Sequence, residues 1–118
     1  MKHFLGLTAT LAVLAGLSLA APNPKTFHGQ IMDSVCAGNG NHDAGYKLTS
    51  TSTPKACTLA CVKNGATLVL YNPEDKTTYK LSDQKRAMKM AGREVRVTGT
   101  LDQATNTIHV TSIAAGKS

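Results

Sequence analysis

Three cysteines and one histidine lie close together in this chain and could hold a metal ion. Cys36, His42, Cys57 and Cys61 fall within 26 consecutive positions, and the 118-residue chain has no further cysteine. Three thiolates and an imidazole make a complete tetrahedral ligand set for Zn²⁺, and thiolates also suit Cu(I). On a helix, the spacing of Cys57 and Cys61 puts both thiols on one face. The pattern therefore predicts a metal site with these four residues as ligands, and zinc or copper(I) as the ion.

Two other interpretations of the cysteines stay open. Disulfides are common in exported proteins, and Cys36 could pair with Cys57 or Cys61, which would leave one thiol free. A bond between Cys57 and Cys61 along one helix face is geometrically awkward. A redox-active thiol set is the third interpretation, although the Cys-x-x-x-Cys spacing differs from the Cys-x-x-Cys of thioredoxin-like motifs.

Two neighbours of Cys36 could support such a site. Asp33 lies just before it, and its carboxylate could bond backbone N–H groups of the next segment or orient His42 from outside the ligand set. Met32 shares a strand face with Cys36, so a soft thioether could approach the thiols, which keeps copper(I) in consideration.

The first 20 residues predict a secretory signal peptide. Met1–His3 is a short basic start, an apolar stretch follows, and Ser18 and Ala20 supply the small residues that precede cleavage. We therefore expect an exported protein, periplasmic or extracellular, with no membrane anchor after cleavage. The expected organisation is a signal peptide at 1–20, a flexible lead-in at 21–25, one domain at 26–113 and a disordered tail at 114–118.

The remaining elements must position the cysteines. Alternating apolar and polar residues predict five short strands, at 26–35, 66–71, 77–81, 93–101 and 107–113. Helices are predicted after Thr53-Pro54 up to Asn64-Gly65, and after Asp83 up to Met90. The segment 37–52, rich in Gly, Asn, Ser and Thr, predicts a long loop without periodicity.

This order of elements predicts a mainly β protein with short helices. The preferred architecture is a five-stranded barrel of the oligonucleotide/oligosaccharide-binding (OB) type, with a helical cysteine-bearing insertion between the first two strands. The alternative is an open five-stranded sheet with one helix across it. In the OB barrel, Leu68 and Leu70 would face inward, and Tyr71 would present an aromatic ring on the outer, ligand-binding face.

Composition limits the partners. The formal net charge is +6, but the chain has no Trp, three Tyr and two Phe. Nucleic-acid platforms need exposed rings, so we expect no nucleic-acid partner; a small ligand, a sugar or a protein could bind near Tyr71. No motif of a catalytic site is present, and four protein ligands would leave no open position on a metal. We therefore expect a binding domain and not an enzyme.

Three stretches of the chain resemble a family of small exported bacterial proteins of unknown function. The family pattern reads D-S-x-C, H, then C-x-x-x-C-V-K-x-G-A, which is similar to Asp33–Cys36, His42 and Cys57–Ala66 here. The similarity continues at Val95–Leu101 and Thr107–Val110. The resemblance implies an exported OB-like domain and implies no established reaction.

Overall fold

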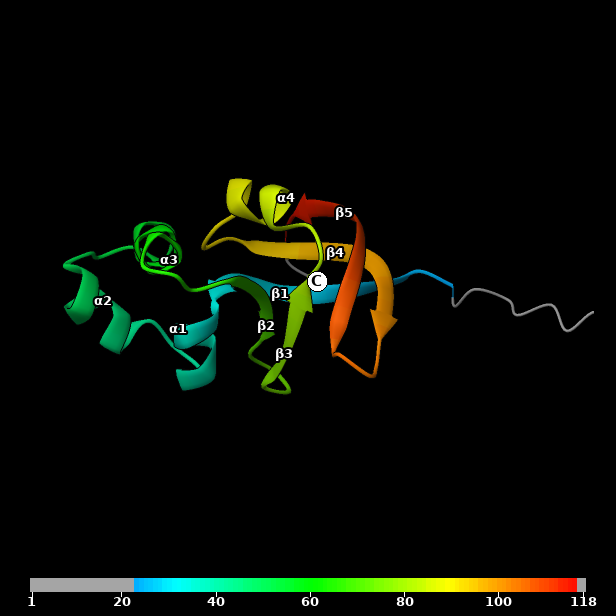
Figure 1. Ribbon diagram of the computed structural model, residues 1–118, viewed down its shortest axis with the longest axis horizontal. Helices are drawn as coiled ribbons and strands as arrows, with labels where there is room; N and C mark the ends of the chain where they lie inside the picture. The colour runs from blue at the N-terminus through cyan, green and yellow to red at the C-terminus, as the bar shows by residue number, and fades with distance from the viewer. Residues whose placement is uncertain (1–22, 117–118) are drawn as a thin grey trace, which may run out of the picture.

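The computed structural model describes residues 23–116, which form five strands and four short helices (Figure 1). In chain order the elements are β1 (Lys25–Asp33), α1 (Ser34–Asn39), α2 (Asp43–Thr49), α3 (Pro54–Lys63), β2 (Leu68–Asn72), β3 (Thr77–Leu81), α4 (Gln84–Lys89), β4 (Glu94–Asp102) and β5 (Thr107–Ala115). The predicted signal peptide lies outside the described residues. None of the helices between residues 23 and 116 is long and apolar enough to cross a membrane.

The five strands close into a ring in the order β1-β2-β3-β5-β4. Every neighbouring pair is antiparallel except β3 and β5, which run parallel and share only two paired positions. The ring is therefore uneven, because one seam is much shorter than the others. The predicted OB-like, mainly β architecture is confirmed, and the open sheet is excluded.

Strand β1 joins two neighbours by pairing with β4 through residues 25–30 and with β2 through residues 30–33. Gly29 lies where the strand passes from one partner to the other. A Cβ atom there would collide with the backbone carbonyl of Tyr71. Glycine thus allows the close backbone approach that closes the ring at this point.

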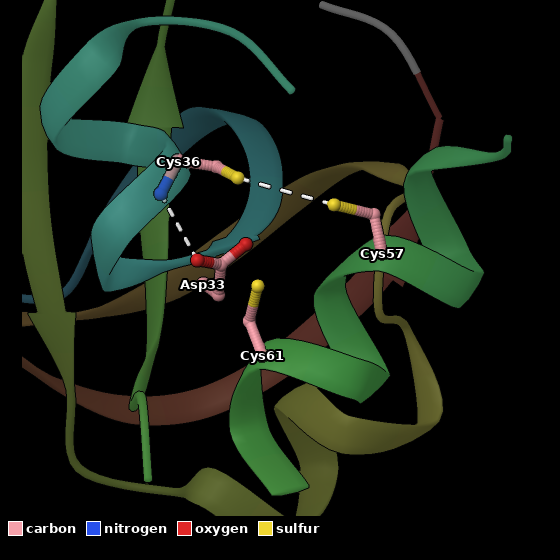
Figure 2. A group of neighbouring side chains, drawn as sticks. All are labelled: Asp33, Cys36, Cys57 and Cys61. Carbon is pink, nitrogen blue, oxygen red and sulfur yellow. Dashed lines mark hydrogen bonds between the residues drawn. The ribbon is translucent and has the colours of Figure 1, made fainter. Parts of the chain in front are cut away.

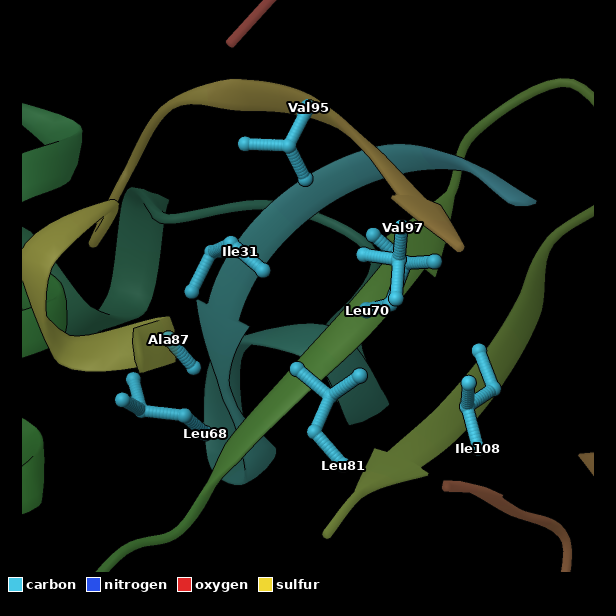
Figure 3. Packing of buried hydrophobic residues seen from close by; sticks show 8 residues of the cluster. All are labelled: Ile31, Leu68, Leu70, Leu81, Ala87, Val95, Val97 and Ile108. Atoms are coloured by element: carbon cyan, nitrogen blue, oxygen red, sulfur yellow. The ribbon is translucent and has the colours of Figure 1, made fainter. Parts of the chain in front are cut away.

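The main hydrophobic core fills the inside of the ring (Figure 3). Leu68 and Leu70 point into it from β2, as their alternation with Val69 and Tyr71 predicts, and Ala87 brings α4 onto the same core. Its fully or almost fully buried members are Ile31, Leu68, Leu70, Leu81, Ala87, Val95, Val97 and Ile108.

A second hydrophobic cluster lies on the outside of the ring, beneath the inserted helices. Strands β1 and β2 contribute Met32, Val69 and Tyr71, and the insertion contributes Cys36, Ala37 and Cys57. Helices α1, α2 and α3 gather on this one side of the barrel (Figure 1). Both faces of β2 are consequently buried, which explains its unbroken apolar run.

This second cluster corrects the prediction for Tyr71. The residue does face outward from the ring, but only 7% of it is exposed because α1 covers this part of the sheet. Tyr71 is therefore not an open aromatic platform. Its alternation along the strand predicts which face it occupies and carries no information on what covers that face.

The segment 37–52, predicted to be a loop, contains the end of α1 and all of α2. Gly40, with a φ of 76°, ends α1, and the Asn41 side chain accepts a hydrogen bond from the Asp43 amide to start the next turn. The predicted first strand is also too long: it ends at Asp33, and Val35, inside the predicted range, is 55% exposed on α1. Strand β5 continues to Ala115, beyond the predicted end at Ile113.

Candidate metal centre

The D-S-x-C sequence is a helix N-terminus that fixes one cysteine in place. Asp33 ends β1 and caps α1, and its Oδ2 accepts a hydrogen bond of 2.9 Å from the Cys36 amide. Ser34 pairs with Thr67, just before β2: its amide donates to the Thr67 carbonyl at 2.8 Å, and its hydroxyl accepts from the Thr67 amide at 3.2 Å. The first turn of α1 is therefore held against the barrel.

Helix α3 supplies the other two thiols. Thr53 caps it by accepting a bond from the Ala56 amide, and Pro54 occupies its first turn, as the sequence predicts. Cys57 and Cys61 lie one turn apart and face Cys36 and Asp33 across the gap between the helices (Figure 2). Val62, on the next position, packs against the barrel core.

The three thiols meet at one carboxylate. One ligand atom from each of Asp33, Cys36, Cys57 and Cys61 lies within 4.8 Å of all the others. The first three of these residues are fully buried and Cys61 is half-buried. The Sγ atoms of Cys36 and Cys57 are 4.0 Å apart, against about 2.05 Å in a disulfide, so all three cysteines are free thiols here. The predicted gathering of the three cysteines is confirmed.

Asp33 has one of the two roles predicted for it. Its carboxylate accepts a hydrogen bond from the backbone amide of Cys36, as predicted, but it makes no hydrogen bond to His42 and lies among the thiols instead. Oδ2 is engaged in capping α1, but Oδ1 is fully buried and has no hydrogen-bond partner among residues 23–116. A buried carboxylate oxygen without a partner is costly, and a bound cation would satisfy it.

Burial suppresses ionisation of two of the thiols, Cys36 and Cys61. Burial raises the pKa of Cys61 to about 11, and the neighbouring Asp33 carboxylate adds to the effect. Burial also raises the pKa of Cys36 far above its usual value, again reinforced by Asp33. Both thiols are therefore protonated at neutral pH, and a metal ion that binds them must displace their protons.

His42 lies beside this group and outside it. It precedes α2, is 7% exposed, and stacks on the ring of Tyr46 with centroids 5.6 Å apart. Both ring nitrogens are buried without a partner among the described residues. Burial lowers the His42 pKa, which keeps the imidazole neutral and available as a ligand at neutral pH. Its role as a ligand stays a prediction, because Asp33 occupies the fourth position in the structure.

A glycine covers the cluster. Gly45 lies in α2, and a Cβ atom there would come within 2.6 Å of the Cys36 sulfur and 2.7 Å of the Cys57 sulfur. Only glycine lets the backbone of α2 rest directly on the two thiols. The sequence predicts a loop for this segment, and a glycine in a loop needs no special explanation. Only its position in α2, against the two thiols, shows why glycine is required there.

One family model matches part of the chain. Residues 62–116 are similar to a protein family of unknown function, DUF5818. The match starts directly after Cys61, so it covers α4 and strands β2 to β5 and leaves out the whole candidate metal centre. No curated protein and no solved structure matches the chain significantly.

Proposed function

We propose that this protein is an exported metal-binding domain that holds one divalent zinc ion between Cys36, Cys57, Cys61 and Asp33. The observation that carries the proposal is the meeting of three thiols with a buried carboxylate oxygen that lacks a partner. Structural zinc sites are closed tetrahedra of protein ligands, and this set supplies four. The domain is a binding module rather than an enzyme, because such a site leaves no position for a substrate.

The carboxylate favours zinc over copper(I). Carboxylate oxygen is a hard ligand, which Zn²⁺ accepts in tetrahedral sites and soft Cu(I) disfavours. Met32 packs in the same hydrophobic cluster as Cys36 and Cys57, so a thioether is near, but the buried charge of Asp33 is better matched to a divalent ion. Copper(I) is accordingly the second candidate.

The ion would join the insertion to the barrel. Asp33 belongs to β1 and Cys36 to α1, whereas Cys57 and Cys61 belong to α3. A shared ion therefore links three elements that are separated along the chain. Its binding free energy would become stability of the insertion, because the ligands are assembled only in the folded state.

Elemental analysis of the protein, purified without chelators after secretion, tests this proposal. We expect stoichiometric zinc, and cobalt loading should give thiolate-to-metal charge-transfer absorption. Cys57→Ser and Cys61→Ser should lose the ion, and Asp33→Asn should weaken binding about tenfold or more while it still caps α1. Asp43→Asn, an acidic residue of the same insertion outside the cluster, is the matched control. If His42→Gln weakens binding and Asp33→Asn does not, His42 is the fourth ligand.

A disulfide module is the second candidate function, and the Cys36 and Cys57 sulfurs, 4.0 Å apart, are its candidate pair. Thiol titration of the secreted protein separates the two candidates. One free thiol per chain, assigned to Cys61 by mass spectrometry and accompanied by no metal, would replace the zinc proposal by the disulfide.

A further inference from the structure

A cavity of about 440 Å³ lies on the outer surface between the C-terminal end of α1 and the turn that follows β2. Met32 and Tyr71 form part of its wall, together with Gln30, Asn72 and Glu74. Its volume is in the range of sites for small molecules. A second cavity of about 350 Å³ adjoins it, and the two share Gly40 and Tyr71.

The Tyr71 hydroxyl is the main reason to regard this cavity as a site. The residue is 93% buried, since 7% is exposed, yet its hydroxyl has no hydrogen-bond partner among residues 23–116. That oxygen lies next to Gly40, where an added Cβ would be 3.1 Å away, so glycine leaves it open to the two cavities. The hydroxyl oxygen is not among the buried atoms that lack a partner, so it can bond water or a molecule bound in the cavity. The same cavity borders His28, whose Nδ1 is buried without a hydrogen-bond partner among residues 23–116.

The other polar groups of the wall offer both donors and acceptors. The Gln30 amide nitrogen donates to the Gly92 carbonyl at 3.0 Å, which leaves the Gln30 side-chain oxygen to accept. The Asn72 side-chain oxygen accepts from the Glu74 amide at 3.0 Å, which leaves the Asn72 side-chain nitrogen to donate. The Glu74 carboxylate adds an acceptor, and the Tyr71 hydroxyl can do either.

This combination selects the ligand class. Within the described residues 23–116, no lysine or arginine lines the larger cavity, and Glu94 lines it as well as Glu74, so an anionic ligand would meet carboxylates without a compensating cation. An ammonium group could donate to the acceptors of the wall, but it would leave the Asn72 side-chain nitrogen without an acceptor. Hydroxyl groups both donate and accept, and they can use every member of the wall, while Met32 offers apolar contact to C–H groups.

We propose that this cavity binds a neutral, hydroxyl-rich ligand of one or two sugar rings, with Tyr71, Asn72, Gln30 and Glu74 as its hydrogen-bonding groups. The site is separate from the metal centre and does not depend on it for its polar groups. Its wall shares Met32 and Tyr71 with the hydrophobic cluster around Cys36, so the two sites have one packed boundary in common.

An NMR titration of the uniformly ¹⁵N-labelled protein tests the proposal. The neutral probes are maltose and N,N′-diacetylchitobiose; putrescine and citrate are the cationic and anionic comparisons. We expect at least one disaccharide to shift the amide signals of Gly40, Asn72 and Glu74 in a saturable way, and Tyr71→Phe to weaken that binding about fivefold, the effect of one lost hydrogen bond.

Tyr79→Phe is the matched control, because it removes a phenol hydroxyl from a ring that packs on Phe27 and does not line the cavity. It should leave the affinity unchanged. The proposal is overturned if neither disaccharide shifts these signals, if putrescine or citrate shifts them more strongly than both sugars, or if the two tyrosine variants behave alike.

Discussion

At the residue scale, the candidate metal centre depends on one aspartate with two tasks. The two oxygens of Asp33 are divided between the Cys36 amide and the cluster of thiols. A single side chain thus sets the start of α1, orients the first cysteine and supplies the charge that a divalent ion requires. Asparagine can replace it in the first task and not in the last, which is why Asp33→Asn separates capping from metal binding.

A second prediction at the residue scale concerns the substitution of Gly45. Alanine at this position would place a methyl group against the sulfurs of Cys36 and Cys57. We expect Gly45→Ala to lower the free energy of unfolding by about 1–3 kcal/mol through overpacking, and to reduce the metal content, as measured by denaturant titration and elemental analysis.

Gly38→Ala is the control for this prediction. Gly38 lies in α1 of the same insertion, and an added Cβ there meets nothing within 4 Å. The alanine should be neutral or should stabilise by about 0.5–1 kcal/mol, because it favours the helix. Equal losses of stability in the two variants would contradict the role of Gly45 as a cover for the thiols.

At the element scale, α3 is the element that carries two of the three thiols, and its start is defined by one hydroxyl. The Thr53 side chain accepts from the Ala56 amide at 3.2 Å. Thr53→Ala should cost about 1 kcal/mol of stability in thermal or chemical unfolding. Ser52→Ala, an exposed neighbour outside the cap, should change little; a loss of the same size there would show that the effect does not come from capping.

The β2–β3 turn gives a pH-dependent prediction. The Thr77 hydroxyl and amide both donate to the Asp75 carboxylate, at 2.6 and 3.0 Å, and these bonds lower the Asp75 pKa. A lowered folded-state pKa adds stability that is present above the unfolded-state pKa and is lost as the pH falls through the folded-state value. Thr77→Val should raise the Asp75 pKa toward its ordinary value in an NMR titration. An unchanged pKa would mean that the hydroxyl is not the cause.

At the scale of the whole molecule, the domain has two hydrophobic clusters, one inside the ring and one between the ring and the insertion. Only the second one contains candidate metal ligands. The barrel therefore has a core of its own, whereas α1 and α2 are short helices packed around the thiols. This division predicts how the protein responds to loss of the ion.

Removal of the proposed zinc ion should loosen the insertion and spare the barrel. We expect a chelator to accelerate amide hydrogen exchange in α1 and α2, including the Tyr46 amide that bonds to the His42 carbonyl, while the Val97 region of β4 stays protected. Uniform acceleration across all strands would show that the barrel also depends on the ion, and no acceleration would argue against a metal in the native protein.

The exposure of the aromatic side chains allows a prediction about nucleic-acid binding. Among residues 23–116, every Phe and Tyr ring is buried or half-buried, so none of them offers an open stacking platform, although the chain carries a formal charge of +6. We expect labelled single-stranded DNA to bind weakly, with an affinity that falls steeply as salt increases. Sub-micromolar binding at physiological salt that Tyr71→Ala abolishes would contradict this expectation.

The sequence alone indicates the order of strands and helices and the common face of Cys57 and Cys61. Strand alternation, the Thr53-Pro54 start and the Asn64-Gly65 end are local signals, and the structure reproduces them within a few residues. The spacing of Cys57 and Cys61 fixes their common face for the same local reason. Such features follow from backbone geometry over a few consecutive residues, which is what a sequence pattern reports.

The tertiary structure decides the rest. Whether Asp33 or His42 joins the thiols depends on how α1 and α2 fold back over β1, a contact that no local pattern encodes. The burial of Tyr71 and the need for glycine at position 45 likewise arise only when the insertion lies on the barrel. Short helices with weak periodicity are stabilised by such packing more than by their intrinsic helix propensity. Their sequence therefore predicts a loop, and only the tertiary structure shows the surface against which they pack.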